Sequence, residues 1–101
     1  MNQLLRQAQK MQEEMLAAQE ELAAKTFEGS SGGGMVKASV SGAQELRSIE
    51  ISKDVVDPDE VEMLEDLIVA AVRAAHDAAA TAAAEQLGGI SGGLDMGGLL
   101  G

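Results

Sequence analysis

The feature that most constrains the fold is a long heptad pattern at the start of the chain. Apolar side chains recur there at alternating intervals of four and three residues: Leu4, Ala8, Met11, Met15, Ala18 and Leu22. This spacing predicts one apolar seam along an α-helix over residues 2–24. At 1.5 Å per residue the helix would be ~33 Å long, so a small sheet cannot cover its seam. We therefore expect a partner helix, from this chain or from a second copy, to pack against it.

Composition supports a second copy. The chain has 101 residues, a single aromatic side chain, Phe27, and no cysteine. A core this short of aromatic area buries little surface, and no disulfide can stabilise it. We predict one domain over residues 1–87, a flexible Gly-rich tail over residues 88–101, and a homodimer as the working form.

A short antiparallel meander is predicted in the middle of the chain. Residues 26–28 suit a strand, and Gly32 to Gly34 interrupt it. Residues 35–41 then alternate apolar and polar side chains, and a turn over residues 42–45 leads to a second alternating run that contains Ile49 and Ile51. Each of these two runs has one polar and one apolar face. The apolar faces must lie on the same side of the sheet, and this requirement specifies the pairing register of the two strands.

The apolar pattern selects one pairing of these two strands. If Ser41 pairs with Leu46, Val36 lies opposite Ile51 and all the inward apolar residues share one face. A slip by one residue would place the isoleucines against the polar face. We predict the pairing that starts at Ser41 and Leu46.

A second long helix follows the meander. Asp57 suits the N-cap, Pro58 the first helical position, and Glu60 the capping box. The pattern predicts a helix up to Leu87, where Gly88 ends it. Its apolar face holds Val61, Leu64, Ile68, Ala71, Val72 and Ala75. The predicted fold class is α+β, with an α-β-β-β-α subunit in which two long helices flank the meander.

Residues for catalysis and for metal binding are scarce. The chain has one histidine, His76, and no cysteine, so it lacks the nucleophile–base pair that hydrolysis or group transfer requires. The glycine-rich segment 29–34 suits either a phosphate loop or a hairpin connection, and the strand that follows it favours the connection. The acids of residues 57–66 suit either weak cation binding or a solvated helix start, and their spacing favours the latter. We predict no enzyme activity, no cofactor, no metal and no small-molecule substrate.

The charge distribution limits the kind of partner. The formal net charge is −10, which disfavours phosphate-rich partners at long range. Arg6 and Lys10 nevertheless lie one helical turn apart and off the apolar seam, so the first turns of this helix are the most positive part of the chain. In the alternative interpretation these two residues only solvate the helix. No stretch approaches 18 consecutive apolar residues, so we expect no membrane span. No apolar h-region follows Arg6 and Lys10, so we expect no signal peptide.

Three segments in this order closely resemble the YbaB/EbfC family of bacterial nucleoid-associated proteins: LRQAQKMQEEM (5–15), EGSSGGGMVK (28–37) and DPDEVEMLEDLIVAAV (57–72). The resemblance spans residues 4–94. It implies a tweezer-like homodimer whose sheets join at the centre and whose helices project as arms. It also implies DNA binding without strong sequence preference, and a location in the cytoplasm at the nucleoid.

One departure from the family affects the predicted site. Relatives tend to carry several lysines along the second helix after the VAAV segment, whereas this chain keeps Arg73 alone before Leu87. Fewer phosphate contacts mean weaker binding and a weaker salt dependence. We therefore assign DNA contact to the phosphate-binding residues Arg6 and Lys10, with Lys25 as a helper. The predicted dimer contacts are Met11, Met15, Leu22, Val36 and Val40.

A second hypothesis belongs to another functional class. The acidic helix face of Glu62, Glu65 and Asp66 would dock a basic protein, such as a recombination or replication factor. In that case the protein is an interaction dimer and DNA is not its ligand. Binding to DNA near 50 mM salt distinguishes the two hypotheses.

Overall fold

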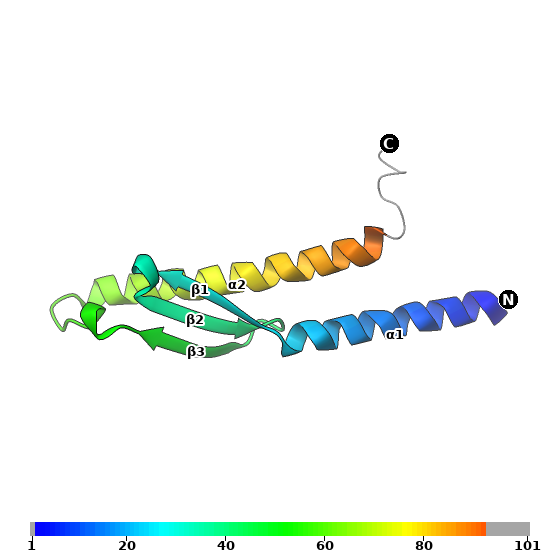
Figure 1. Cartoon of the computed structure of the whole chain (residues 1–101), viewed down its shortest axis with the longest axis horizontal. Coiled ribbons are helices and arrows are strands. Elements are labelled where there is room, and N and C mark those ends of the chain that lie inside the picture. Colours follow the sequence, from blue (N-terminus) through cyan, green and yellow to red (C-terminus); the bar gives the residue numbers. More distant parts are fainter. Residues whose placement is uncertain (1, 93–101) are drawn as a thin grey trace, which may run out of the picture.

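The computed structural model describes residues 2–92, which form two long helices and a three-stranded sheet (Figure 1). The elements follow in the order α1 (Asn2–Ala24), β1 (Thr26–Ser31), η1 (Gly32–Gly34), β2 (Val36–Ser41), β3 (Leu46–Ile51), η2 (Lys53–Val55) and α2 (Val61–Gly92). The predicted α-β-β-β-α order is confirmed. The molecule is long and thin, with extents of 69 × 30 × 16 Å.

The sheet is antiparallel in the order β1-β2-β3, so β2 is the central strand. Val36 lies opposite Ile51 and Ala38 opposite Ile49, as the apolar pattern predicted. The predicted pairing of Ser41 with Leu46 is wrong. Leu46 instead faces Val40, because a bulge interrupts the register between Ser39 and Val40.

Hydrogen bonds in the β2–β3 turn explain this bulge. The Ser41 backbone N–H donates to the Glu45 carbonyl at 2.8 Å, and the Ser41 hydroxyl accepts from the backbone N–H groups of Ala43 and Glu45, each at 3.2 Å. The turn thus occupies the polar groups of Ser41, and the ladder with β3 begins one residue earlier on β2.

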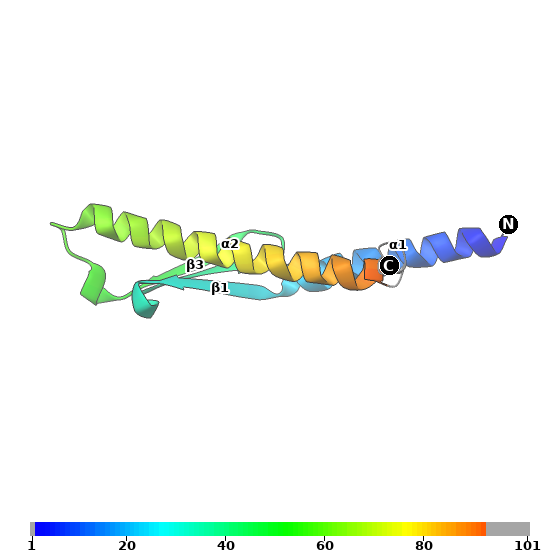
Figure 2. The same ribbon diagram turned by 90° about the horizontal axis from the view of Figure 1, so that it is seen from above.

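The core lies between α2 and the first two strands. The side chains of Val36, Ala38 and Val40 on β2 are fully buried, and so is a stripe of alanines on α2 formed by Ala71, Ala75 and Ala79. Figure 2 shows α2 running the length of the sheet. Small side chains on this helix face allow the helix and the sheet to approach closely.

Gly29 on β1 is the point of closest approach. A Cβ atom at this position would lie 2.2 Å from the backbone nitrogen of Ala75 and 2.5 Å from the carbonyl oxygen of Ala71. Both neighbours are backbone atoms of α2, so they cannot move aside as a side chain would. The packing of α2 on the sheet therefore requires glycine at residue 29.

The start of α2 differs from the prediction. Asp57 caps a turn before the helix: its Oδ1 accepts from the Asp59 N–H, and its carbonyl accepts from the Glu60 N–H, both at 2.9 Å. The first helical bond runs from the Leu64 N–H to the Glu60 carbonyl at 3.3 Å. The helix proper begins at Val61.

The end of α2 also differs, because the helix passes through Gly88 and ends at Gly92. The predicted end at Leu87 is wrong. A glycine in a helix costs only about 1 kcal/mol relative to alanine, and the alanine-rich segment before it favours continuation. The predicted flexible tail remains a prediction, since its residues 93–101 lie outside the described part of the chain.

The helix α1 projects from one end of the sheet as a rod, and none of its described residues is buried (Figure 1). Its C-terminal end is fixed at Gly42, where a Cβ atom would lie 1.8 Å from the Leu22 carbonyl oxygen, and the Gly42 N–H donates to Lys25 O at 3.1 Å. A further bond joins the two helices, from Gln86 Nε2 to the Ala18 carbonyl at 3.1 Å. The first four turns of α1 extend beyond these contacts.

We predict that Gly29→Ala lowers the free energy of unfolding by about 2–3 kcal/mol, because the added methyl group overpacks the backbone of α2. Denaturant unfolding at fixed protein concentration measures the change. Gly88→Ala is the matched control: its Cβ meets nothing within 4 Å, and the exchange raises helix propensity, so stability should stay equal or rise. Equal stability of Gly29→Ala and wild type would contradict the close approach described above.

Candidate nucleic-acid interface

The two predicted DNA contacts lie on the projecting part of α1. Arg6 and Lys10 are both exposed and are one helical turn apart. At about 100° per residue they lie on the side of α1 opposite the apolar seam. The segment is helical because leucine, alanine, glutamine, arginine and lysine all favour helix. The two cations therefore share one accessible face.

The charge around these cations changes sharply along α1. Residues 2–12 contain no acid, whereas Glu13, Glu14, Glu20 and Glu21 follow in the second half of the helix. The acids of residues 57–66 lie near the start of α2, at the opposite end of the molecule (Figure 1). Since the Debye length is about 8 Å at physiological salt, that distant charge is screened from the free end of α1.

Lys25 is not brought together with the other two cations. It is exposed in the junction between α1 and β1, and the fifteen residues that separate it from Lys10 correspond to ~22 Å along the helix axis. A DNA duplex in contact with Arg6 and Lys10 would have to run along α1 to reach it.

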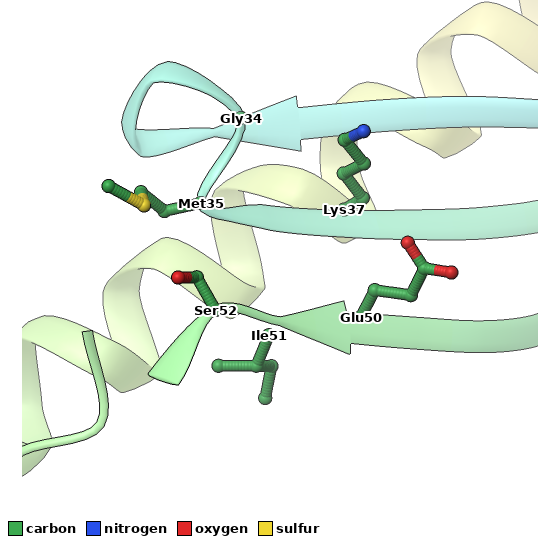
Figure 3. A pocket seen from close by; sticks show the side chains of 6 residues that line it. All are labelled: Gly34, Met35, Lys37, Glu50, Ile51 and Ser52. Atoms are coloured by element: carbon green, nitrogen blue, oxygen red, sulfur yellow. The ribbon is translucent and has the colours of Figure 1, made fainter. Parts of the chain in front are cut away.

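Lys37 has an acidic neighbour. It pairs across the sheet with Glu50, and both side chains project to the same side of a shallow open depression of about 250 Å³ (Figure 3). The rest of the lining comes from Gly34, Met35, Ile51 and Ser52. The carboxylate beside Lys37 weakens this depression as a site for phosphate.

The structure separates the predicted dimer contacts into two groups. Met11 and Met15 are 45% and 37% exposed on α1, so both are accessible. Val36 and Val40 are 0% exposed beneath α2, so they belong to the core of the subunit and are not on an accessible surface. Leu22 is half-buried at the contact with Gly42.

Sequence reasoning missed an apolar surface beside β3. The helix α2 covers β1 and β2, and every residue of β3 remains exposed. Ile49 and Ile51 are 38% and 39% exposed on the face of the sheet that carries Val36 and Ala38. Their register was predicted correctly, but the pattern does not show which strands the helix covers.

The neighbouring side of α2 continues this surface. An open groove of about 350 Å³ is lined by Ile68, Val69, Val72, Arg73 and His76. From Val61 to Gln86 this helix is long and apolar enough to cross a membrane by length and composition, with a mean hydropathy of 1.3. We attribute this apolarity to packing, because one face of the helix forms the core. Only 17% of the 18-residue window is buried, so apolar surface remains for another contact.

The single histidine ties α2 to the β2–β3 turn. His76 Nδ1 is hydrogen-bonded to Gln44 Oε1, and Gln44 Nε2 donates to the His76 carbonyl at 3.1 Å. Gln44 adopts a positive φ of 67°, which places its amide in this position. Within residues 2–92, no group of three or more histidine, aspartate or glutamate side chains is arranged to hold a metal ion.

Comparison with known proteins gives consistent matches. The model of the YbaB/EbfC DNA-binding family matches residues 1–94. A nucleoid-associated protein of Streptomyces griseus is 52% identical over 98 residues, which cover 97% of this chain and 86% of the relative. One of Thermoanaerobacter pseudethanolicus is 53% identical over 98 residues, covering 97% and 88%. The crystal structure of an uncharacterized protein from Helicobacter pylori has the same fold, with a TM-score of 0.71, 22% identity and coverage of 84% and 89%.

We predict that Arg6→Ala/Lys10→Ala changes the free energy of unfolding by less than about 0.5 kcal/mol, because both side chains are exposed and alanine favours helix. Thermal unfolding followed by circular dichroism measures the change. A larger loss would show that these cations contribute to the fold, and they would then be unsuitable as probes of binding.

Proposed function

The chain belongs to the YbaB/EbfC DNA-binding family, and on that premise we propose that it binds DNA through the free end of α1. It is a nucleoid-associated protein of the bacterial cytoplasm and not an enzyme. The observation that supports the proposed site is the segment of residues 2–12, which contains no acid and in which every residue is exposed, in a chain of net charge −10. No other exposed helix segment of comparable length among residues 2–92 lacks acids and carries two cations.

Arg6 and Lys10 contact phosphate oxygens in this proposal. Such contacts fix the position of a duplex and are independent of base sequence. Each neutralised phosphate releases counterions, so the affinity falls as salt rises. Lys25 adds a further contact where the duplex runs along α1.

We propose that the protein acts as a homodimer, which doubles these few contacts. A two-fold contact places each surface against its own copy, so a strongly acidic chain must pair through a surface that carries little charge. The surface formed by Ile49, Ile51, Val69 and Val72 meets this requirement, and Arg73 is the one cation that lines its groove. In this dimer the two α1 helices form the arms of a tweezer-like outline, with Met11 and Met15 on the seam between the arms.

The DNA contacts are tested by charge reversal. Arg6→Glu/Lys10→Glu should lower the affinity for duplex DNA at least about tenfold at low salt, because up to four phosphate contacts per dimer are lost. For wild type, four contacts give a slope of log affinity against log salt of about −3.6. Electrophoretic mobility shift or fluorescence anisotropy at several salt concentrations measures both quantities.

Lys37→Glu/Lys53→Glu is the matched control, because it makes the same change in net charge on exposed residues away from α1. It should lower the affinity much less. Unchanged affinity of the Arg6→Glu/Lys10→Glu variant at low salt would refute the residue assignment. If wild type binds no DNA near 50 mM salt, the docking of a basic protein on Glu62, Glu65 and Asp66 becomes the better hypothesis.

The dimer surface is tested by burying a charge in it. Val69→Glu or Ile49→Glu should raise the dissociation constant of the dimer by at least about 100-fold. Each of the two subunits would bury one unpaired carboxylate in the interface. Light scattering after size exclusion gives the mass at each concentration. Ser48→Glu on the opposite face of β3 is the control and should remain dimeric. A dimer that survives both changes on the apolar surface must form elsewhere.

A further inference from the structure

The projecting part of α1 has two sides of different chemistry. The other side from the apolar seam carries Arg6 and Lys10, and we call these two residues the cation face. The seam itself consists there of four exposed side chains, Leu4, Ala8, Met11 and Met15. At about 100° per residue, Arg6 lies ~170° and Lys10 ~130° around the helix from the mean direction of these four. A surface that covers the seam therefore leaves the cation face free.

The seam side of α1 is also the side that meets the body of its own subunit. Ala18 and Leu22 continue the seam toward the sheet, and both are half-buried. The Ala18 carbonyl accepts the bond from Gln86 on α2, and Leu22 lies against Gly42. The cation face is therefore on the side of α1 that is directed away from the sheet and from α2.

A two-fold axis turns this asymmetry into two separate surfaces for DNA. In the proposed dimer the seams of the two α1 arms face each other, because their apolar side chains are buried between the arms. The two cation faces then point away from the axis, in opposite directions. They are separated by the width of two helices, about 20–24 Å, which is more than two Debye lengths at physiological salt. Two duplexes held on these faces would repel each other only weakly.

One short duplex cannot use both cation faces. Between the arms it would meet apolar side chains such as Met11 and Met15, which offer no charge to phosphate. Outside the arms it would have to bend around them, and DNA is stiff over about 150 base pairs. We propose that each arm holds its own duplex, so that one dimer bridges two segments of DNA. This inference rests on the proposed DNA site and dimer, and it adds the number and the position of the duplexes.

Capture of a second duplex tests the bridge. Beads carry one duplex, and a fluorescent duplex is added together with the full chain at low salt, at a protein concentration that does not saturate the beads. Wild type should retain at least about fivefold more fluorescent duplex than Arg6→Glu/Lys10→Glu, because each arm needs its cations. Lys37→Glu/Lys53→Glu makes the same change in net charge and should capture as wild type does.

The salt dependence counts the contacts on each duplex. When both arms are occupied, the four cations of the two cation faces are shared between two duplexes. A duplex of about 12 base pairs, which reaches one arm only, should therefore give a slope of log affinity against log salt of about −1.8. The slope of about −3.6 applies to a long DNA molecule that reaches both arms. A slope near −3.6 for the short duplex would place both arms on it and contradict the bridge.

A disulfide between the arms tests where the duplex lies. The chain contains no cysteine, so Met11→Cys introduces the only thiol of each subunit, on the seam. Oxidised glutathione should join the two arms of this variant, whereas Gln9→Cys, on the side of the cation face, should stay unlinked because its thiols are too far apart. The oxidised Met11→Cys dimer should bind and capture DNA within about twofold of its reduced form, because the phosphate contacts lie outside the arms.

The opposite results identify which part of the proposal is wrong. If wild type binds a duplex but captures no second one, or if the disulfide abolishes binding, the bridge is wrong. If Met11→Cys cannot be linked, the seams do not face each other and the arrangement of the arms is wrong. In all three cases the DNA site stands as long as Arg6→Glu/Lys10→Glu weakens binding. If that variant binds as wild type does, the site on α1 fails, and with it both proposals.

Discussion

The close contact between Gly29 and the backbone of α2 determines how the rest of the subunit is arranged. The helix lies over β1 and β2, and it can approach them closely because Ala71 and Ala75 have small side chains. The same placement leaves β3 uncovered. The apolar surface that this creates, around Ile49 and Val69, is a direct consequence of where α2 sits.

The predictable parts of this fold are those that depend on periodicity. The apolar seam of α1 and the alternation in β2 specify helices, strands and most of the register. Local hydrogen bonds are harder to anticipate: the Ser41 hydroxyl accepts two backbone bonds in its turn, and this shifts the pairing of Leu46 by one residue. The alternation of apolar and polar residues also does not show which element covers an apolar face. For this reason the sequence predicts Val36 and Val40 as dimer contacts, although α2 buries both within the subunit.

The candidate site follows from the distribution of charge more than from its total. A net charge of −10 opposes DNA binding only where the acids lie within reach of the duplex. The acids near the start of α2 are at the far end of a molecule 69 Å long. The cations of α1 were visible in the sequence, but their exposure and their separation from the acids at the start of α2 required the structure. Lys25 shows the reverse case: the sequence assigns it to the same site, but it lies ~22 Å from Lys10 along the helix axis and farther still from Arg6.

The attachment of α1 makes it a lever. Its fixed points are the contact of Leu22 with Gly42 and the bond from Gln86 to Ala18, and both lie in its last two turns. From Leu22 to Arg6 the helix extends ~24 Å, so a tilt of about 10° at these fixed points displaces Arg6 by ~4 Å along its arc. In a dimer with two such arms, a small change in packing at Gly42 would open or close the gap between their tips by up to about twice that distance, which is a substantial fraction of a groove width.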